Sequence, residues 1–305
     1  MAQTGTIGDK IFRTILFITA ATIVVIMAAM IFMMVWNSLP TIKNYGLSFL
    51  IGREWKPAED VFGALPFIYG TIVSSVIALV ISVPLSLGIA IFLTEQAPKK
   101  IATPIAFLVE LLAAIPSVVY GLWGIFVLAP FVRDYLGVFL EKYLGWLPLF
   151  QGRLTGIGML TGGIILALMV TPIVTAVVRD ILEVVPTQQR EAALALGATK
   201  WETTQIVLGN AASGIAGAVV LGLGRALGET MAVTMVIGNS PQISTSLFEP
   251  AYTIASVLAA NFAEATDKLY LSALIEIGLV LFLVTFVVNA FAKLLVSRVG
   301  KRMHA

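Results

Sequence analysis

Six apolar stretches, each about long enough to cross a lipid bilayer, constrain the fold of this chain more than any other feature. They lie at approximately residues 15–36, 66–94, 104–130, 155–179, 211–237 and 269–296. A hydrocarbon core of about 30 Å needs roughly 20 apolar residues in a helix. Of the 305 residues, 59% are hydrophobic and only 12% are charged, which is more apolar surface than a soluble core can bury. The sequence therefore predicts an all-α, polytopic membrane protein with about six transmembrane helices.

The basic residues predict which side of the membrane holds the two termini. Six spans put both termini on one side, together with the loops near residues 95–103 and 180–210. Eleven lysines and arginines lie in or beside these segments, against seven on the opposite side. The positive-inside rule then places both termini in the cytoplasm. The external loops would cover about 37–65, 131–154 and 238–268.

The same pattern divides the chain into three parts. Residues 1–65 would form an N-terminal cytoplasmic tail, an uncleaved first span and an external loop. Residues 66–296 would form the core domain, which contains the long cytoplasmic loop 182–210. Residues 297–305 would form a basic cytoplasmic tail.

Composition and missing motifs limit the chemistry that we expect. The chain has no cysteine, so disulfides, iron–sulfur ligation and thiol nucleophiles are excluded. The single histidine, His304, is next to the C-terminus, which favours neither a metal site nor a catalytic triad. No GxxxxGK[ST] motif is present to hold ATP phosphates, and a net charge of +2 is too small to indicate nucleic acid. We therefore expect no enzyme activity, no metal and no cofactor in this chain itself.

The second external loop has an unusual composition. It contains "RDYLGVFLEKYLGWLPLFQGR" at residues 133–153, which is rich in aromatic residues and leucine. This pattern predicts short amphipathic helices that lie along the membrane interface. The last external loop contains "PAYTIASVLAANFAEA", which also has a helical pattern.

The cytoplasmic loop 182–210 is far longer than a connector between two spans requires. Thr187 is a candidate N-cap for a helix through "QQREAALAL", Gly197 breaks that run, and "TKWETTQIVL" is expected to begin a second short helix. Such a pair of helices could dock into a groove on another protein. A surface hairpin without a partner is the alternative that the residues alone leave open.

Arg225 and Glu229 stand out inside the fifth apolar stretch, in "VLGLGRALGETMAV". Inserting either charge at a helix centre costs roughly 2.5–3.5 kcal/mol, and a spacing of four residues lets the two form an ion pair. One interpretation is a structural pair that only fixes helix packing. The other is that Arg225 lines a pathway and meets an anion, because a guanidinium offers a planar fork to oxyanions. Glu229 would then orient Arg225 or replace the anion at rest.

Three further residues in the apolar stretches are candidates for function. Glu110 lies inside the third stretch, in "FLVELLAAIPSVVYG", and could reach a partner across the bundle. Pro116 is expected to kink this stretch and to free carbonyl groups near Ser117, which could line a pathway. Glu276, near the outer end of the sixth stretch, is expected to lie at the membrane interface.

Two sets of motifs carry a resemblance to a known family. Glu191-Ala192-Ala193 followed by Gly197 resembles the EAA motif of membrane subunits in bacterial ABC importers. The family usually ends this motif with Leu-Pro, whereas Leu208-Gly209 stands here. Together with "ELLAAIPSVVYG" and "LGLGRALGETMAV", the loop is similar to the C-type permease subunits of bacterial phosphate-specific transport systems over most of residues 60–296.

The resemblance implies a fold, a function and partners. The fold would be that of MetI-like ABC importer permeases, and the function would be translocation of inorganic phosphate across the bacterial inner membrane. The implied partners are a homologous second permease subunit, a dimer of cytoplasmic ATP-binding subunits that hold ATP and Mg, and an external phosphate-binding protein. The substrate pathway would include Arg225, Glu229, Glu110 and Ser117, and the ATPase contact would include Glu191, Ala192, Ala193 and Gly197.

Other functions fit parts of the sequence. A proton-coupled secondary anion transporter is the main alternative, because Glu110 and Glu229 could relay protons. The long helical loop and the lack of a clear inverted repeat argue against it. A channel or an intramembrane enzyme has less support, since a single ion pair is no ring of charge. An ABC importer for another oxyanion, such as sulfate, molybdate or phosphonate, is equally compatible with a guanidinium.

Overall fold

The computed structural model describes residues 7–303, with side chains described from residue 8 to residue 294. His304 therefore lies outside the described residues, as do the side chains of the predicted basic tail. The described chain is helical, without a β-strand between residues 7 and 303. The predicted all-α class is confirmed.

Thirteen α-helices follow one another in the described residues. They are α1 (Ile7–Tyr45), α2 (Ser48–Ile51), α3 (Leu65–Ile91), α4 (Lys99–Ala114), α5 (Ser117–Trp123), α6 (Ala129–Phe131), α7 (Gly137–Leu144), α8 (Met159–Val184), α9 (Thr187–Ala195), α10 (Lys200–Gly228), α11 (Met231–Val236), α12 (Ile254–Asn261) and α13 (Lys268–Met303). Short π-helical turns occupy Phe92–Gln96, Gly124–Leu128 and Val132–Leu136. Short 3₁₀ turns occupy Pro57–Glu59 and Pro148–Phe150.

Six helical segments of the described chain are long and apolar enough to cross a membrane, as predicted. They are Gly8–Tyr45, Leu65–Gln96, Ser117–Leu144, Met159–Val184, Lys200–Gly228 and Lys268–Leu294. Four of the six agree with the predicted stretches apart from their ends. The third and the fifth do not.

The predicted third stretch 104–130 is not one continuous helix, because it is divided among α4, α5 and the π-turn Gly124–Leu128, and the single helical segment of sufficient length here is Ser117–Leu144. Ile115 and Pro116 have extended backbone, with ψ of 129° and 140°, and they separate α4 from α5. The predicted kink at Pro116 is thus a complete break, because proline disfavours the helical region for the residue before it. The break frees carbonyl groups, and that of Leu112 accepts a hydrogen bond from the Tyr120 hydroxyl at 2.9 Å.

The fifth candidate span also differs from the predicted stretch 211–237. The helix α10 begins at Lys200 and continues without interruption to Gly228, so the second short helix of the loop is the first part of a span. Gly209 permits this because glycine, unlike the proline usual in the resembled motif, keeps its backbone N–H. The helix then ends before Glu229, whose ψ is 129°.

The caps of the loop helices explain where they begin. Pro186 occupies the N-cap position of α9, so Thr187 is the first helical residue and the predicted N-cap at Thr187 is wrong. Thr199 caps α10 instead. Its side chain and that of Glu202 form a reciprocal capping box with each other's backbone N–H.

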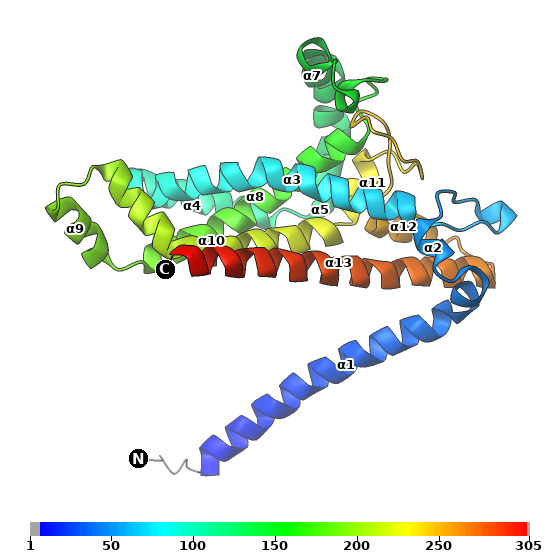
Figure 1. The fold of residues 1–305 in the computed structure, drawn as a ribbon, viewed down its shortest axis with the longest axis horizontal. Coiled ribbons are helices and arrows are strands. Elements are labelled where there is room, and N and C mark those ends of the chain that lie inside the picture. The colour runs from blue at the N-terminus through cyan, green and yellow to red at the C-terminus, as the bar shows by residue number, and fades with distance from the viewer. Residues whose placement is uncertain (1–6, 304–305) are drawn as a thin grey trace.

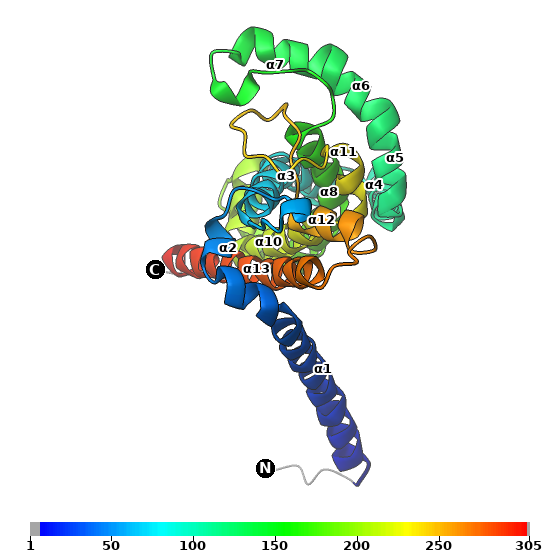
Figure 2. The same cartoon turned by 90° about the vertical axis from the view of Figure 1, so that its right-hand side faces the viewer.

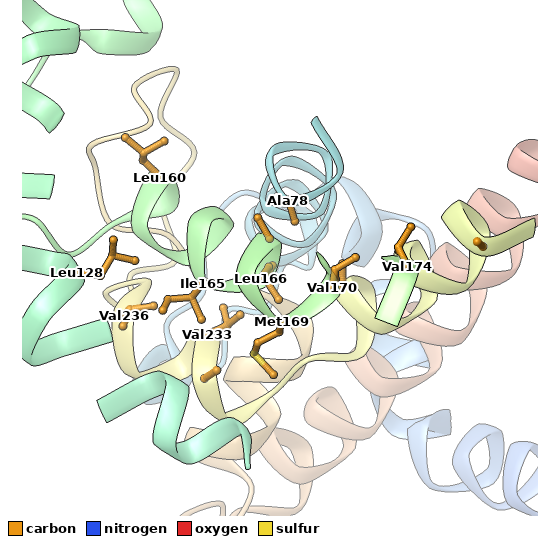
Figure 3. Close-up of a cluster of buried hydrophobic side chains, with 14 of the residues drawn as sticks. Ala78, Leu128, Leu160, Ile165, Leu166, Met169, Val170, Val174, Val233 and Val236 are labelled. Atoms are coloured by element: carbon orange, nitrogen blue, oxygen red, sulfur yellow. The ribbon is translucent and has the colours of Figure 1, made fainter. Parts of the chain in front are cut away.

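The helix α8 is the centre of the bundle. Of its most apolar window, 72% is buried, the highest share among the six candidate spans. Ile165, Leu166 and Val170 of α8 pack with Ala78 of α3 and Val233 of α11 (Figure 3). Ser86 of α3 donates a hydrogen bond to the Thr171 carbonyl at 3.0 Å, which links the two helices directly. The core thus fixes α3, α8, α10 and α11 relative to one another.

The helix α1 leaves the bundle at an angle (Figures 1 and 2). None of its most apolar window is buried within the chain. It is held at its C-terminal end, where the Thr41 hydroxyl donates to Ser272 of α13 at 2.8 Å. A second hydrophobic cluster lies at this end of the molecule, with Trp55 in edge contact with Phe67 at a ring distance of 5.0 Å.

Candidate functional site

Arg225 lies in the last turn of α10, three residues from its end at Gly228. The unpaired carbonyl groups of a helix C-terminus carry partial negative charge, so a cation there is stabilised by about 0.3–1 kcal/mol. The sequence predicted a position past the middle of a continuous span, and the structure instead shows a helix end. The helix dipole therefore offsets part of the cost of placing this charge in an apolar segment.

The ion pair predicted between Arg225 and Glu229 is present. Nη2 of Arg225 lies 3.3 Å from Oε2 of Glu229. The helix stops between them, so the two residues do not share one helical face as a simple four-residue spacing would imply. Glu229 Oε1 faces the backbone N–H of Ala232 in α11 at the long distance of 3.5 Å. The carboxylate thus sits at the junction of α10 and α11.

The two partners of this pair differ in exposure. The side chain of Glu229 is 6% exposed, whereas that of Arg225 is 48% exposed. Glu229 is also the one polar partner that the described residues give Arg225. A single contact leaves most of the five guanidinium N–H donors able to bind an oxyanion. The arrangement is a fixed carboxylate beside an accessible cation.

Exposed apolar residues and two glycines lie near Arg225 in the sequence. Leu221, one turn before it, and Met231 of α11 are 54% and 47% exposed. Gly224 and Gly228 leave the helix surface open beside the guanidinium, since a Cβ at either position would meet no atom within 4 Å. Nothing in the described chain covers this surface, so another molecule can approach the guanidinium directly.

Glu110 pairs with a different arginine. Its Oε1 accepts a hydrogen bond at 2.9 Å from Nη1 of Arg179, which lies in α8 and is only 19% exposed. Arg179 also bonds Asp180 at 3.0 Å and lies 3.8 Å from Glu183. Glu110 was predicted to reach a partner across the bundle. That partner is Arg179 of the same chain, and the pair joins α4 to α8.

Ser117 is the first residue of α5 and is half-buried. The helix α5 packs against α11, next to the Arg225–Glu229 junction. Among the described residues, no hydrogen bond or ion pair connects Ser117 or Glu110 to Arg225. Of the four predicted pathway residues, Arg225 and Glu229 are therefore in contact, whereas Ser117 and Glu110 lie elsewhere.

The residues of the EAA-like motif lie on α9 and the turn after it. Ala193 is buried against α10, whereas Glu191 and Ala192 are exposed. Gly197 has a φ of +87°, in the left-handed region that favours glycine. The positive φ turns the chain sharply from α9 into α10. This turn makes the loop a defined helical corner at one end of the bundle (Figure 1).

The exposed side of this corner is unusually apolar for a surface loop. Leu194 is 51%, Leu196 is 90% and Trp201 is 56% exposed. Exposed apolar groups that gather on one surface mark an interaction site. The corner therefore has the composition of a docking surface.

Sequence analysis missed the ion pair that holds α9 to the bundle. Arg190 donates to both carboxylate oxygens of Glu95, at 3.2 and 2.8 Å, and to the carbonyl oxygens of Val185 and Leu182, at 2.6 and 2.9 Å. Arg190 is 20% exposed and Glu95 is 9% exposed. We call these four residues the α9 clamp. An arginine just before the EAA-like motif was visible in the sequence, but nothing there pointed to a partner in the π-turn after α3.

Glu276, which was predicted to lie near the membrane interface, is buried within the chain. It is 6% exposed and lines a cavity of about 1330 Å³ between α1, α10 and α13. Asn289, further along α13, lines the same cavity. Oε2 of Glu276 and Oδ1 of Asn289 have no hydrogen-bond partner in the described chain. The angle between α1 and α13 accounts for the cavity, because the two helices diverge from their contact at Thr41 and Ser272 (Figure 1).

The fold and these sites define a class of protein. A bundle of apolar helices, a charged pair at a helix break and a rigid helical corner at one end characterise a multi-pass transport permease. The chain belongs to the family of binding-protein-dependent transport system inner membrane components, whose model matches residues 82–301. The family membership and the multi-pass inner-membrane location predicted from the sequence are confirmed.

Curated relatives cover almost the whole chain. A phosphate transport system permease protein PstC of Xylella fastidiosa is 47% identical over 300 residues, which covers 97% of this chain and 92% of that protein. The protein of the same name from Mesorhizobium japonicum is 44% identical over 302 residues, covering 97% and 92%. A probable PstC of Methanocaldococcus jannaschii is 40% identical over 260 residues, covering 83% and 82%.

A solved structure supports the fold independently. A chain of the MetNI methionine ABC transporter, in an inward-facing conformation, superimposes with a TM-score of 0.55. The match covers 78% of this chain and 94% of that chain at 18% sequence identity. The predicted ABC importer permease fold is therefore confirmed.

Proposed function

We propose that this chain is the C-type membrane-spanning subunit of an ATP-driven importer for inorganic phosphate. The observation that carries the proposal is the 47% identity, over 97% of the chain, to a phosphate transport system permease protein. The geometry at Arg225 agrees with it, because an exposed guanidinium beside a fixed carboxylate suits a tetrahedral oxyanion. Competing oxyanions share this chemistry, so substrate choice is part of the test.

Arg225 would act as a cation with two alternative partners. In the resting state Glu229 holds the guanidinium through the 3.3 Å contact. An arriving phosphate would take the remaining N–H donors and weaken that contact, and Glu229 would reclaim the arginine once the anion moves on. The accessible surface at Arg225 would face the pathway shared with a homologous second permease. Ser117 and Glu110 would lie further along that pathway.

The energy would come from partner subunits. The corner formed by α9 and Gly197 would dock into a cytoplasmic dimer of ATP-binding subunits, which would carry ATP and Mg. Exposed Glu191, Ala192 and Leu196 would contact that dimer, while buried Ala193 would hold α9 on α10. An external phosphate-binding protein would deliver the substrate to the opposite end. Both termini would then be cytoplasmic.

Reconstituted vesicles test this proposal directly. The chain, co-purified with its partner subunits, should take up labelled phosphate only with ATP on the ATPase side and binding protein on the other side. Uptake should persist with a proton uncoupler, and excess sulfate or molybdate should not compete. Uptake that collapses with the uncoupler and ignores ATP would instead establish a proton-coupled carrier, and competition by sulfate would reassign the substrate.

A further inference from the structure

A helical arm projects from the bundle between α5 and α8, and its first part is the second half of the candidate segment Ser117–Leu144. This aromatic arm comprises residues 129–150, which include α6, the π-turn Val132–Leu136, α7 and the 3₁₀ turn Pro148–Phe150. Figures 1 and 2 both show α7 standing away from the long helices. The site and the proposed transport mechanism give the arm no role.

The inner face of the arm is packed against the protein. Val132 is buried, and Leu136 and Leu140 contact the central hydrophobic cluster. Gly137 is in close contact with Leu154, because a Cβ there would lie 2.7 Å from the leucine Cδ2. The arm is therefore fixed by its inner face rather than hanging free.

The opposite face of the arm is a stripe of exposed rings. We call these residues the aromatic stripe: Phe131 (49% exposed), Tyr135 (69%), Phe139 (57%), Tyr143 (58%) and Trp146 (74%). Consecutive members are three or four residues apart, as on one face of a helix. Phe131 stacks on Tyr135 at 5.8 Å, and Phe139 meets Tyr143 at 4.7 Å between ring centres. The rings thus contact one another in two pairs, and the rest of the described chain leaves about half or more of each ring residue exposed.

Charged groups lie beside this stripe. Arg133 and Asp134 form a bidentate pair at 2.7 and 3.0 Å. Lys142 places its ammonium 5.5 Å from the centre of the Tyr143 ring, and Glu141 next to it is exposed. Rings with polar tips beside exposed charges are the chemistry of the boundary between headgroups and acyl chains, where tyrosine and tryptophan are enriched.

The position of the arm in the chain agrees with that chemistry. The arm follows α5 and leads to Met159, where α8 begins. The helix α4, which packs along α8 and bonds it through Glu110 and Arg179, makes the membrane crossing before the arm together with α5, so the second half of the candidate segment Ser117–Leu144 is free to lie along the surface. Since α9 follows the other end of α8, the arm lies at the membrane surface remote from the α9 corner. The π-turn Gly124–Leu128 precedes the arm, and α5, α6 and α7 follow one another in a single curved path beside the bundle (Figure 2).

We infer that the aromatic arm lies flat in the bilayer interface of the leaflet opposite α9, with its aromatic stripe in contact with phospholipid. The partner is a lipid surface, and the rings sit at the level where acyl chains meet headgroups. Glu141 and Arg133 face the aqueous side. This inference requires only the multi-pass membrane location and does not depend on the substrate.

Spin labels can measure the depth of each face, since the chain has no native cysteine. Single variants Phe139→Cys and Trp146→Cys, and the matched polar control Glu141→Cys, are labelled in the full chain. The chain is reconstituted with its partner subunits in phosphatidylethanolamine–phosphatidylglycerol vesicles. Collisions with oxygen, which concentrates in lipid, and with a water-soluble nickel chelate are then compared for each label.

We expect the labels at 139 and 146 to collide mainly with oxygen and the label at 141 mainly with the nickel chelate. This pattern should be the same with and without the external binding protein. Equal access of nickel to all three labels would overturn the inference, because the stripe would be in water. Low access of both reagents at 139 and 146 would also overturn it, because the stripe would be covered by protein. Retained uptake by the labelled chains confirms that they are assembled.

Discussion

Arg225 and Glu229 form an ion pair whose partners have opposite surroundings. Glu229 is buried at the junction of α10 and α11, and Arg225 extends from the last turn of α10 to an open apolar surface. An ion pair built only for packing would be expected to bury both charges, since an exposed charge in an apolar region is costly. The asymmetry therefore favours the interpretation in which Arg225 meets a ligand.

Removing both charges separates this role from simple packing. Arg225→Met with Glu229→Leu should insert and assemble normally, because replacing an ion pair by apolar residues is often neutral or stabilising. Phosphate uptake should nevertheless fall by at least about tenfold, which corresponds to ~1.4 kcal/mol. Arg225→Lys should be partly active, because it keeps the charge but loses the planar fork. ATP-dependent uptake in vesicles is the measurement, with assembly checked by co-purification.

A double variant that transports phosphate at the native rate would assign the pair to packing alone. Leu221→Met, one turn from Arg225 on the same exposed surface, is the matched control for a nearby change that leaves the charges intact. Its uptake should equal that of the native chain.

At the scale of elements, the helical corner of α9 and α10 is joined to the bundle in two ways. The helix α10 is itself a span, so a movement of the corner is transmitted along one continuous helix from Lys200 to Gly228. The α9 clamp connects the other side of the corner to α8 and to the π-turn after α3. The corner is thus rigidly attached at both ends, as a docking element that transmits force requires.

Two variants can distinguish the role of the α9 clamp from that of the exposed docking surface beside it. Arg190→Met leaves the buried Glu95 carboxylate without its partner, a change that costs about 3–5 kcal/mol in fully buried pairs. The variant should still retain the ATPase in a pull-down but transport less phosphate for each ATP hydrolysed, because α9 no longer moves with α3 and α8. Ala192→Arg, on the exposed face, should instead lose the ATPase from the pull-down.

Both readouts are needed for these two variants. An unchanged ratio of phosphate transported to ATP hydrolysed in Arg190→Met would show that the clamp does not take part in coupling. Native ATPase retention and native uptake in Ala192→Arg would contradict the docking of α9. Arg190→Lys, which keeps the charge but not the fork, should lie between the native chain and Arg190→Met.

At the scale of the whole molecule, the helices differ widely in how much of them the chain itself covers. None of the residues in the most apolar window of α1 is buried, against 72% of those in α8. The orphan polar atoms of Glu276 and Asn289 line the cavity that α1 leaves beside α13. A buried polar group without a partner is costly in an apolar medium. These features agree with a chain that assembles with other membrane-spanning subunits.

Cysteine labelling can establish the orientation of the whole bundle. With a membrane-impermeant maleimide applied outside intact cells, Ser48→Cys and Thr245→Cys should react, because both positions are exposed at the end remote from α9. Lys100→Cys, exposed in the first turn of α4, should react only after the cells are opened. Thr245 is chosen over the neighbouring Ser244 for labelling, because the Ser244 hydroxyl accepts a hydrogen bond from the Ser246 N–H at 3.1 Å. Labelling of Lys100→Cys alone in intact cells would reverse the topology and contradict an importer.

The sequence by itself determined the helical class, the number of candidate spans, the helical corner at the EAA-like motif and the Arg225–Glu229 pair. Each of these depends on apolar length, on local backbone preferences or on residues four positions apart. Only the tertiary structure decided that α10 runs through the loop into the membrane, that Glu276 is buried, and that Glu110 and Arg190 have fixed partners. The pairs Arg179–Glu110 and Arg190–Glu95 join residues 69 and 95 positions apart. The physical reason is that such partners are chosen by the packing of whole helices, which no local pattern of residues encodes.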